Sequence, residues 1–429
     1  MKRRTFLTKT SGLLGLPLLN GLSMKRNIKH FGKTFEYLKN PDLRTKETGD
    51  ALLTVEGAEI SGTTFSRLVW RNIRFINCDF VGGYEIDLDD LEQCVFENCR
   101  FAGIIGWGTQ SDVRFVRCEY KHPSIVLDSK GSTGVRFEQC TYIGQGYDRN
   151  HWGSFGSRGE ATFVGCTVKL TGLSGDQKLT LKDCNLAEVD IQTSGPGGGG
   201  PNFPYCELSI EGCKLTGLTD LQPGYFTNIT IRDTSFEHLN LQNATIKGDV
   251  LLERVKGGFA RFSIYKGAQS FTLRDSTILG NTDADSDIQI TVYAGAFKRV
   301  LVENVQFSEN TTSPWAGIGG GYKIDNQSPQ PVMTETVVFR NVKGANFRSA
   351  GLNAGSVLID RCQFARLKMS DSKINDLTIR NTSISLLFDA HGTRVSGKQY
   401  NGLSAPKRIT GRIENYEDSN VQRSGVNDS

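Results

Sequence analysis

The chain has 429 residues, of which 38% are hydrophobic and 22% are charged, with 48 glycines and only 11 prolines. This composition is sufficient for a buried core and excludes a largely disordered chain. The formal net charge is +4, but Lys2, Arg3, Arg4 and Lys9 all lie in the first 23 residues, and the remainder sums to 4 − 4 = 0. A neutral body offers no electrostatic basis for binding nucleic acid or an anionic membrane, so neither partner is expected.

Residues 1–23 are predicted to be an export signal. The string KRRTFL, from Lys2 to Leu7, resembles the twin-arginine motif and precedes a short apolar stretch. That stretch is too short to cross a bilayer, and no later segment reaches the length of a membrane helix. Because the twin-arginine pathway exports folded proteins, the resemblance implies a periplasmic or extracellular location.

Residues 24–50 are predicted to form an N-terminal cap. Ile28, Phe31, Phe35 and Leu38 have the spacing of one helical face. A short helix here would cover the open first coil of a β structure, which otherwise promotes aggregation. At the other end, residues 404–429 are rich in Arg, Asn, Asp and Ser, and we expect them to seal the last coil and then fray.

Residues 51–403 contain a repeat whose core is a six-residue pattern. Positions 1 and 6 are apolar, position 3 is small or polar, and position 4 is Cys, Thr, Ser or Val, as in FENCRF from Phe96 to Phe101. The common step between copies is near 21 residues, so each unit is too small to bury its own apolar face and must stack on its neighbours. Strand-like alternation excludes helical repeats and predicts an all-β fold, a right-handed parallel β-helix of about 13–14 coils. The copies begin at Phe75, Phe96, Phe115, Phe137, Phe163, Leu181, Ile210, Ile231, Leu252, Leu273, Val302, Phe339, Ile359 and Ile379.

Position 3 is predicted to form a corner. Positions 1 and 4 have opposite strand parity, so the chain must bend between them. Asn, Asp and Gly are frequent at position 3 and tolerate left-handed or bridge conformations. We expect these side chains to align as a ladder in stacked coils. The residues are Asn77, Asn98, Gly165, Asp183, Gly212, Asp233, Asp275, Asn304, Asn341 and Asn381.

Eight of the ten cysteines occupy position 4, where Thr, Ser or Val replaces them in other coils. This interchange indicates a small buried position and not a metal ligand, and no cysteine or histidine spacing is typical of zinc. In-register side chains point the same way, which disfavours disulfides, so we expect buried free thiols. Cys94 and Cys206 lie outside the pattern, and a bridge from Cys94 to Cys118 or from Cys206 to Cys184 remains an alternative.

Four long insertions follow the position 4 strand, at residues 143–161, 187–209, 279–300 and 308–338. We expect them to leave one common corner and to wall a groove, because function in solenoids collects at insertions. A second apolar alternation follows each copy and directs polar and aromatic residues outward. Hydroxyl partners, flat rings and cations of this kind are typical of binding sites for acidic saccharides. The expected substrate-binding residues are Trp152, Asp190, Gln192, Tyr265, Lys266, Trp315 and Asp325.

The repeat, over about 330 residues, resembles the pectate-lyase-like superfamily of right-handed parallel β-helices. The resemblance implies cleavage of an acidic polysaccharide, either by a lyase with a Lys, Arg, Tyr or His base or by a hydrolase with paired carboxylates. Asn281-Thr282-Asp283 begins like a polygalacturonase motif, but the rest of that motif is missing, so the lyase is favoured. The catalytic residues expected from this resemblance are Tyr147, Arg149, His151, Tyr293, Lys323 and Arg348.

Other functions stay open at this stage. Asp283, Asp285 and Asp287 alternate at a spacing of two, which is typical of either a calcium loop or a solvated acidic turn, so calcium is the one cofactor considered. The alternatives to an enzyme are a non-catalytic carbohydrate-binding protein and a structural β-helix at the cell surface. We expect a monomer.

Overall fold

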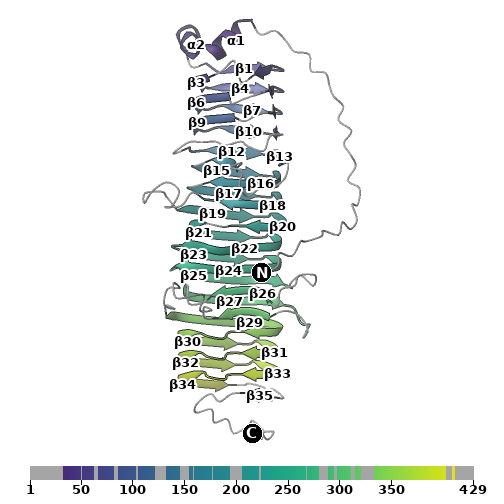
Figure 1. Ribbon diagram of the computed structural model, residues 1–429, viewed down its shortest axis with the longest axis vertical. Coiled ribbons are helices and arrows are strands. Elements are labelled where there is room, and N and C mark those ends of the chain that lie inside the picture. The colour runs from purple at the N-terminus through teal and green to yellow at the C-terminus, as the bar shows by residue number, and fades with distance from the viewer. Residues whose placement is uncertain are drawn as a thin grey trace, which may run out of the picture.

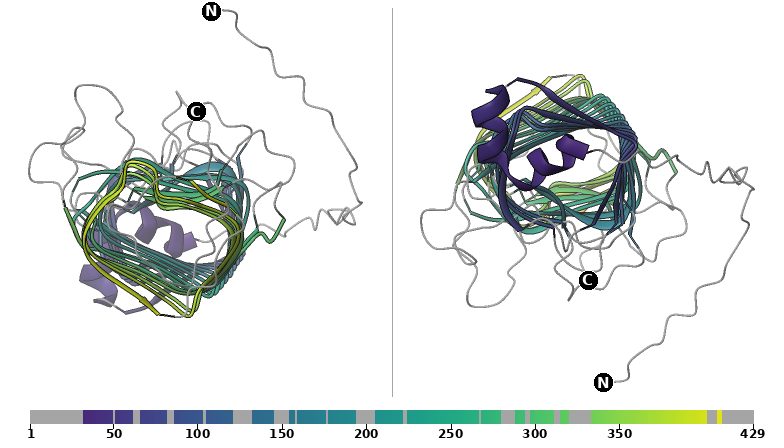
Figure 2. Two further views of the ribbon diagram at one scale, coloured as in Figure 1. Left: turned by 90° about the horizontal axis from the view of Figure 1, so that it is seen from below. Right: turned by 90° about the horizontal axis from the view of Figure 1, so that it is seen from above.

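The protein is an all-β, right-handed parallel β-helix, in which coils stack along one axis from two short helices to the last strand (Figure 1). Viewed along that axis, the coils superpose into one closed outline (Figure 2). No helix among the described residues is long and apolar enough to span a membrane. The computed structural model describes residues 32–49, 51–61, 66–81, 86–102, 105–120, 132–144, 154–157, 159–175, 177–193, 205–221, 224–266, 268–279, 288–293, 297–310, 315–319, 333–401 and 408–410.

The strands that contain positions 1 and 2 of every copy of the repeat form one parallel sheet, which we name the first ladder. Its strands pair in parallel with their neighbours in chain order, which confirms the predicted stacking. Two strands, β1 and β34, extend it beyond the fourteen copies. The ladder consists of β1 (Leu53–Glu56), β4 (Ile73–Ile76), β7 (Val95–Glu97), β10 (Arg114–Val116), β12 (Val135–Glu138), β15 (Glu160–Val164), β17 (Lys178–Lys182), β19 (Cys206–Glu211), β21 (Tyr225–Arg232), β23 (Asp249–Glu253), β25 (Ala268–Ile278), β27 (Phe297–Phe307), β29 (Thr334–Arg348), β30 (Asn353–Asp360), β32 (Lys373–Arg380) and β34 (Arg394–Asn401).

The strands that follow the corner at position 3 form a second parallel sheet, which we name the second ladder. Several of these strands bend and continue onto the face that contains the candidate site. β29 is long enough to join both ladders. Three further strands, β3 (Ser66–Arg71), β6 (Ile86–Glu92) and β9 (Ile105–Ser111), form a small parallel sheet, and β14 (Ser154–Ser157) pairs with β16. The other strands of the second ladder are β2 (Glu59–Ser61), β5 (Asp79–Val81), β8 (Arg100–Phe101), β11 (Glu119–Tyr120), β13 (Thr141–Ile143), β16 (Thr167–Gly175), β18 (Asn185–Gln192), β20 (Lys214–Asp220), β22 (Ser235–Ile246), β24 (Lys256–Lys266), β26 (Ile288–Tyr293), β28 (Trp315–Gly319), β31 (Gln363–Lys368), β33 (Ser383–Asp389) and β35 (Arg408–Thr410).

The corner at position 3 is left-handed, as predicted. All ten Asn, Asp and Gly residues expected there have φ between 50° and 64°. Part of the expected amide ladder forms, because Asn304 donates to Asp275 at 2.8 Å and Asn341 donates to Asn304 at 2.9 Å. The pattern missed four residues of other types that adopt the same conformation, namely Arg117, Gln139, Arg254 and Arg361.

Position 4 is a column of buried thiols, hydroxyls and valine side chains. All ten cysteines are free and buried, so neither alternative disulfide forms. The Sγ atoms of the eight position 4 cysteines lie 3.2–3.6 Å from the carbonyl oxygen two residues earlier. Thr234 and Ser276 donate to the equivalent oxygens at 2.7 and 2.6 Å. The interchange of Cys, Thr and Ser therefore reflects a shared hydrogen bond as well as a shared size, whereas the buried Val255, Val305 and Val342 share the size alone.

The N-terminal end is covered by α1 (Gly32–Lys39) and α2 (Pro41–Thr48), two helices where the sequence predicted one (Figure 2). Leu38 is buried, and its carbonyl accepts a hydrogen bond from the Trp70 indole at 3.1 Å. Arg44, only 6% exposed, donates to the carbonyls of Ala51 at 2.6 Å and Asn72 at 3.1 Å. These contacts satisfy carbonyl groups near the first coils.

Candidate functional site

Ten residues at equivalent register positions of the second ladder form a continuous column, which we name the strip; at Thr291 the structure describes the backbone alone. Each member is the register partner of the next, so neighbouring backbones lie about 4.8 Å apart. The adjacent Val189, Ile191 and Leu239 are fully buried, which directs the strip residues away from the core. The strip consists of Gly172, Asp190, Asp220, Asn240, Arg261, Thr291, Gly317, Arg348, Lys368 and Asp389.

Cations and an aromatic ring gather in the C-terminal half of the strip. Arg348 pairs in register with Gly317 on one side and with Lys368 on the other. The Lys368 ammonium lies 4.6 Å from the centre of the Trp315 ring, a cation–π contact. Beside them, Arg366 donates to the Oδ1 atom of the buried Asn346 at 3.2 Å. This half therefore offers a flat ring next to guanidinium and ammonium donors.

Carboxylates occupy the N-terminal half. Asp190 and Asp220 are direct register partners, and Asn240 donates to Asp220 at 3.3 Å. Asp190 is separated from Thr291 by four strand spacings, or about 19 Å. The N-terminal half is therefore acidic. The half that begins at Arg261 has three cations, Arg261, Arg348 and Lys368, and one carboxylate, Asp389, so it is the half that favours an anionic ligand.

The structure brings together only part of the predicted site. Trp315, Arg348 and the backbone of Tyr293, which pairs with Gly319, lie on successive strands β26, β28 and β29. Asp190 is on the strip but belongs to the acidic half. Gln192, Tyr265 and Lys266 lie in β18 and β24, where the structure describes their backbone alone. Nine predicted residues lie outside the described residues: Tyr147, Arg149, His151, Trp152, Asp283, Asp285, Asp287, Lys323 and Asp325.

The insertions do not share one corner, and that prediction was wrong. Two insertions, between β13 and β14 and between β25 and β26, connect the part of the second ladder before its bend to the part that contains the strip. The chain between β18 and β19, and between β28 and β29, instead connects the strip to the first ladder. The prediction failed because the bend inside the second ladder creates an additional corner. As a result, the described strands from which the insertions leave end at both long edges of the strip.

The charged strip residues that sequence reasoning missed are Asp220, Arg261 and Asp389. In β20 the register shifts between Leu215 and Leu218, where Gly217 has φ 66°, so simple alternation does not place Asp220 correctly. Arg261 follows from alternation in β24, since its neighbour Ala260 is fully buried. Its signal was therefore present in the sequence.

A second polar surface lies on the outward side of the first ladder, at position 2. From Lys182 to Arg380 the charge alternates in sign at every coil, and each residue is the register partner of the next. We name this set the charge ladder. It consists of Lys182, Glu211, Arg232, Glu253, Arg274, Glu303, Arg340, Asp360 and Arg380.

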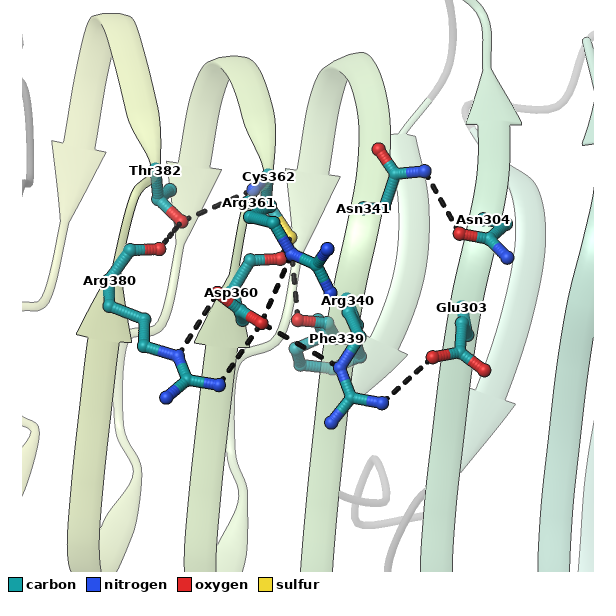
Figure 3. Close-up of polar contacts among 10 residues, drawn as sticks. All are labelled: Glu303, Asn304, Phe339, Arg340, Asn341, Asp360, Arg361, Cys362, Arg380 and Thr382. Atoms are coloured by element: carbon teal, nitrogen blue, oxygen red, sulfur yellow. Dashed lines mark hydrogen bonds and ion pairs between the residues drawn. The ribbon is translucent and has the colours of Figure 1, made fainter.

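Asp360 is the most buried carboxylate of the charge ladder, at 3% exposure. Figure 3 shows it between Arg340, Arg361 and Arg380, whose Nε atoms lie 3.7, 3.3 and 3.1 Å from its oxygens. Burial alone would raise the pKa of Asp360, but hydrogen bonds and charges from Arg380 and Arg361 outweigh it and hold the pKa below its usual value. A carboxylate held ionised in this way is suited to structure and not to proton transfer.

Among the described residues, no group of three or more His, Cys, Asp or Glu side chains has a geometry that would hold a metal ion. The predicted calcium loop lies outside them. Burial raises the pKa of Cys94 and of Cys362 to about 12, so these thiols stay protonated and are poor nucleophiles.

The chain has no significant match among protein-family models, curated proteins or solved structures.

Proposed function

We propose that this protein binds an acidic polysaccharide along the cationic half of the strip and cleaves it by β-elimination. The observation that supports this is the placement of Arg348 and Lys368 on adjacent strands beside the Trp315 ring. An aromatic face suits the apolar face of a sugar, and guanidinium and ammonium groups suit its carboxylate.

The fold adds a weaker argument. Parallel β-helices resemble the pectate-lyase-like superfamily, in which such faces bind and cleave acidic polysaccharides, and we propose membership of that superfamily. Fold alone does not define an activity, so the proposal depends on the strip residues. Export through the predicted twin-arginine signal would bring the protein to an extracellular polymer.

β-Elimination requires a base for the proton at C5 and a cation for the adjacent carboxylate. In this proposal Arg348 neutralises the uronate carboxylate and so acidifies the C5 proton. Tyr293, whose backbone lies in β26, two strands from Arg348, acts as the base in its phenolate form and becomes a phenol when it takes that proton. The electron pair of the C5–H bond forms a C4–C5 double bond, and the C4–O bond breaks to release the preceding sugar, whose oxygen takes up a proton. The product carries an unsaturated uronate.

Two readouts test binding and cleavage separately. Retention in gels containing polygalacturonate, alginate or chondroitin sulfate measures binding, with neutral dextran as a reference, and absorbance from the unsaturated product measures cleavage. The R348Q/K368Q variant should bind at least about tenfold more weakly, since two charged contacts are lost. The matched control K178Q/R299Q removes two cations from the first ladder and should bind as the native protein does.

Equal retention of R348Q/K368Q and the native protein would overturn the proposed binding site. Binding that yields no unsaturated product with any of these polymers would overturn the elimination step and leave a non-catalytic carbohydrate-binding β-helix. If cleavage occurs, the Y293F variant should form no unsaturated product but should still bind the polymer.

A further inference from the structure

The arginines around Asp360 outnumber the carboxylates they contact. Arg340, Arg361 and Arg380 supply three positive charges, whereas Asp360 and Glu303 supply two negative charges, so the group has a net charge of 3 − 2 = +1. The side chains of the three arginines are 34%, 59% and 45% exposed, respectively. We name these three residues the arginine cluster, and Figure 3 shows them in three adjacent coils, with Arg340 in β29, Arg361 in the corner after β30 and Arg380 in β32.

Arg361 uses little of its hydrogen-bonding capacity inside the protein. Its contact with the Asp360 carboxylate runs through Nε at 3.3 Å, and in the described part of the chain its two terminal nitrogens have no protein acceptor. A guanidinium has five N–H donors in a planar fork that matches carboxylate and sulfate oxygens. The outer edge of the fork is therefore available to an external oxyanion.

The backbone conformation at position 361 is strained for an arginine. It has φ 56° at position 3, where the preceding and following coils have Asn341 and Asn381. Asn tolerates this left-handed conformation far better than Arg does. Arg254 adopts the same conformation, but there a bidentate pair with Asp233, at 2.7 and 2.8 Å, offsets the strain. Arg361 has no such compensation, and uncompensated backbone strain is a mark of functional positions.

We propose that the arginine cluster is an oxyanion-binding site for the sulfate or carboxylate groups of a polyanionic polysaccharide. It is separate from the strip, since Arg340 and Arg348 lie on the same strand β29 but belong to the first and second ladders. The coils from β29 to β32 thus present cations on two of their faces. The second site holds the polymer by its charges and takes no part in cleavage.

The R361N variant tests this proposal, because Asn is the usual residue at position 3 and should fold without strain. The test uses full-length protein carrying R348Q/K368Q, so that the strip does not contribute to binding. Affinity for dextran sulfate, polygalacturonate and neutral dextran is measured by calorimetry. R361N should bind the charged polymer about fivefold more weakly, as expected for one exposed charge pair. Its thermal midpoint should stay the same or rise.

R299N is the matched control, since it also removes one cation from the outward side of the first ladder, at a residue whose side chain is 74% exposed. It should leave affinity unchanged. Weakening with dextran sulfate alone assigns the site to sulfate esters, and weakening with both polymers assigns it to oxyanions in general. Unchanged affinity in R361N, or equal losses in R361N and R299N, would overturn the proposal. Neither result bears on the strip, whose cleavage assay uses the unmodified Arg348 and Lys368.

Discussion

The two halves of the β-helix maintain their stacking with different columns. In the N-terminal half, position 1 is phenylalanine, and the rings from Phe75 to Phe163 stack at 4.6–4.9 Å between centres. In the C-terminal half, position 1 is mostly aliphatic. The regular pattern is instead on the outer surface of the first ladder, where the charge ladder alternates in sign from Lys182 to Arg380. The register of the coils is thus fixed by core residues in the N-terminal half and by surface charges in the C-terminal half.

This difference shows two physical ways to fix the register of identical coils. Stacked rings gain their contact energy only when equivalent residues lie directly above one another. Alternating charges act by exclusion, because a slip of one coil would place like charges beside each other along the whole ladder. A long solenoid needs such devices, since its coils otherwise offer many similar pairings.

The largest expected effect is in the aromatic half. Phe115→Ala removes a ring that stacks on Phe96 at 4.9 Å and on Phe137 at 4.8 Å, and it should lower the free energy of unfolding by about 4 kcal/mol. The matched change Ile231→Ala, at position 1 of the other half, should cost about 3 kcal/mol. Urea unfolding followed by circular dichroism measures both. A loss below about 1 kcal/mol for Phe115→Ala would contradict the role of the stack.

An intermediate effect is expected in the charged half. Asp360→Asn leaves three arginines without their shared carboxylate and should cost about 2 kcal/mol at pH 7, since Asp360 is buried but its partners are partly exposed.

The same variant predicts a change in pH dependence. The pKa of Asp360 is lowered by folding, so its stabilisation is present above the unfolded pKa of about 3.9 and is lost as the pH falls through the folded value. Thermal midpoints of native protein and Asp360→Asn should therefore converge below about pH 4. Parallel curves down to pH 2 would show that the carboxylate charge contributes nothing.

The smallest effect is expected at position 4. Cys118→Ser should cost about 1 kcal/mol or less, because Ser276 already makes the equivalent hydrogen bond in another coil. Maleimide labelling should modify none of the ten thiols in the native protein and all of them after unfolding under reducing conditions. Rapid native labelling of any position 4 cysteine would contradict the buried column.

Much of the fold was predictable because the repeat carries it locally. The left-handed corner at Asn98 or Asp233 follows from residue type, and the free thiol of Cys118 follows from the parallel direction of stacked side chains. The charge ladder was equally present in the sequence at position 2 but was overlooked, since it becomes visible only when the copies are aligned and that one column is read down.

The candidate site was less predictable. Arg348 and Trp315 follow from alternation, whereas Asp220 is displaced by the register shift near Gly217. The corner from which each insertion leaves depends on where a strand such as β22 or β24 bends, and the repeat pattern does not encode that bend. Arg361 was missed because position 3 was expected to contain residues that favour a left-handed backbone.

The most direct test of the central claim is a titration of tryptophan fluorescence with polygalacturonate, in the native protein and in W315F. Trp315 lies beside the strip, with its ring against the Lys368 ammonium, whereas the buried Trp70 lies in the separate sheet of β3, β6 and β9. If the acidic polymer binds across the cationic half, the native protein should show a saturable change in emission that W315F lacks. A saturable change of the same size in W315F would mean that the polymer binds elsewhere, and the strip would lose its proposed role.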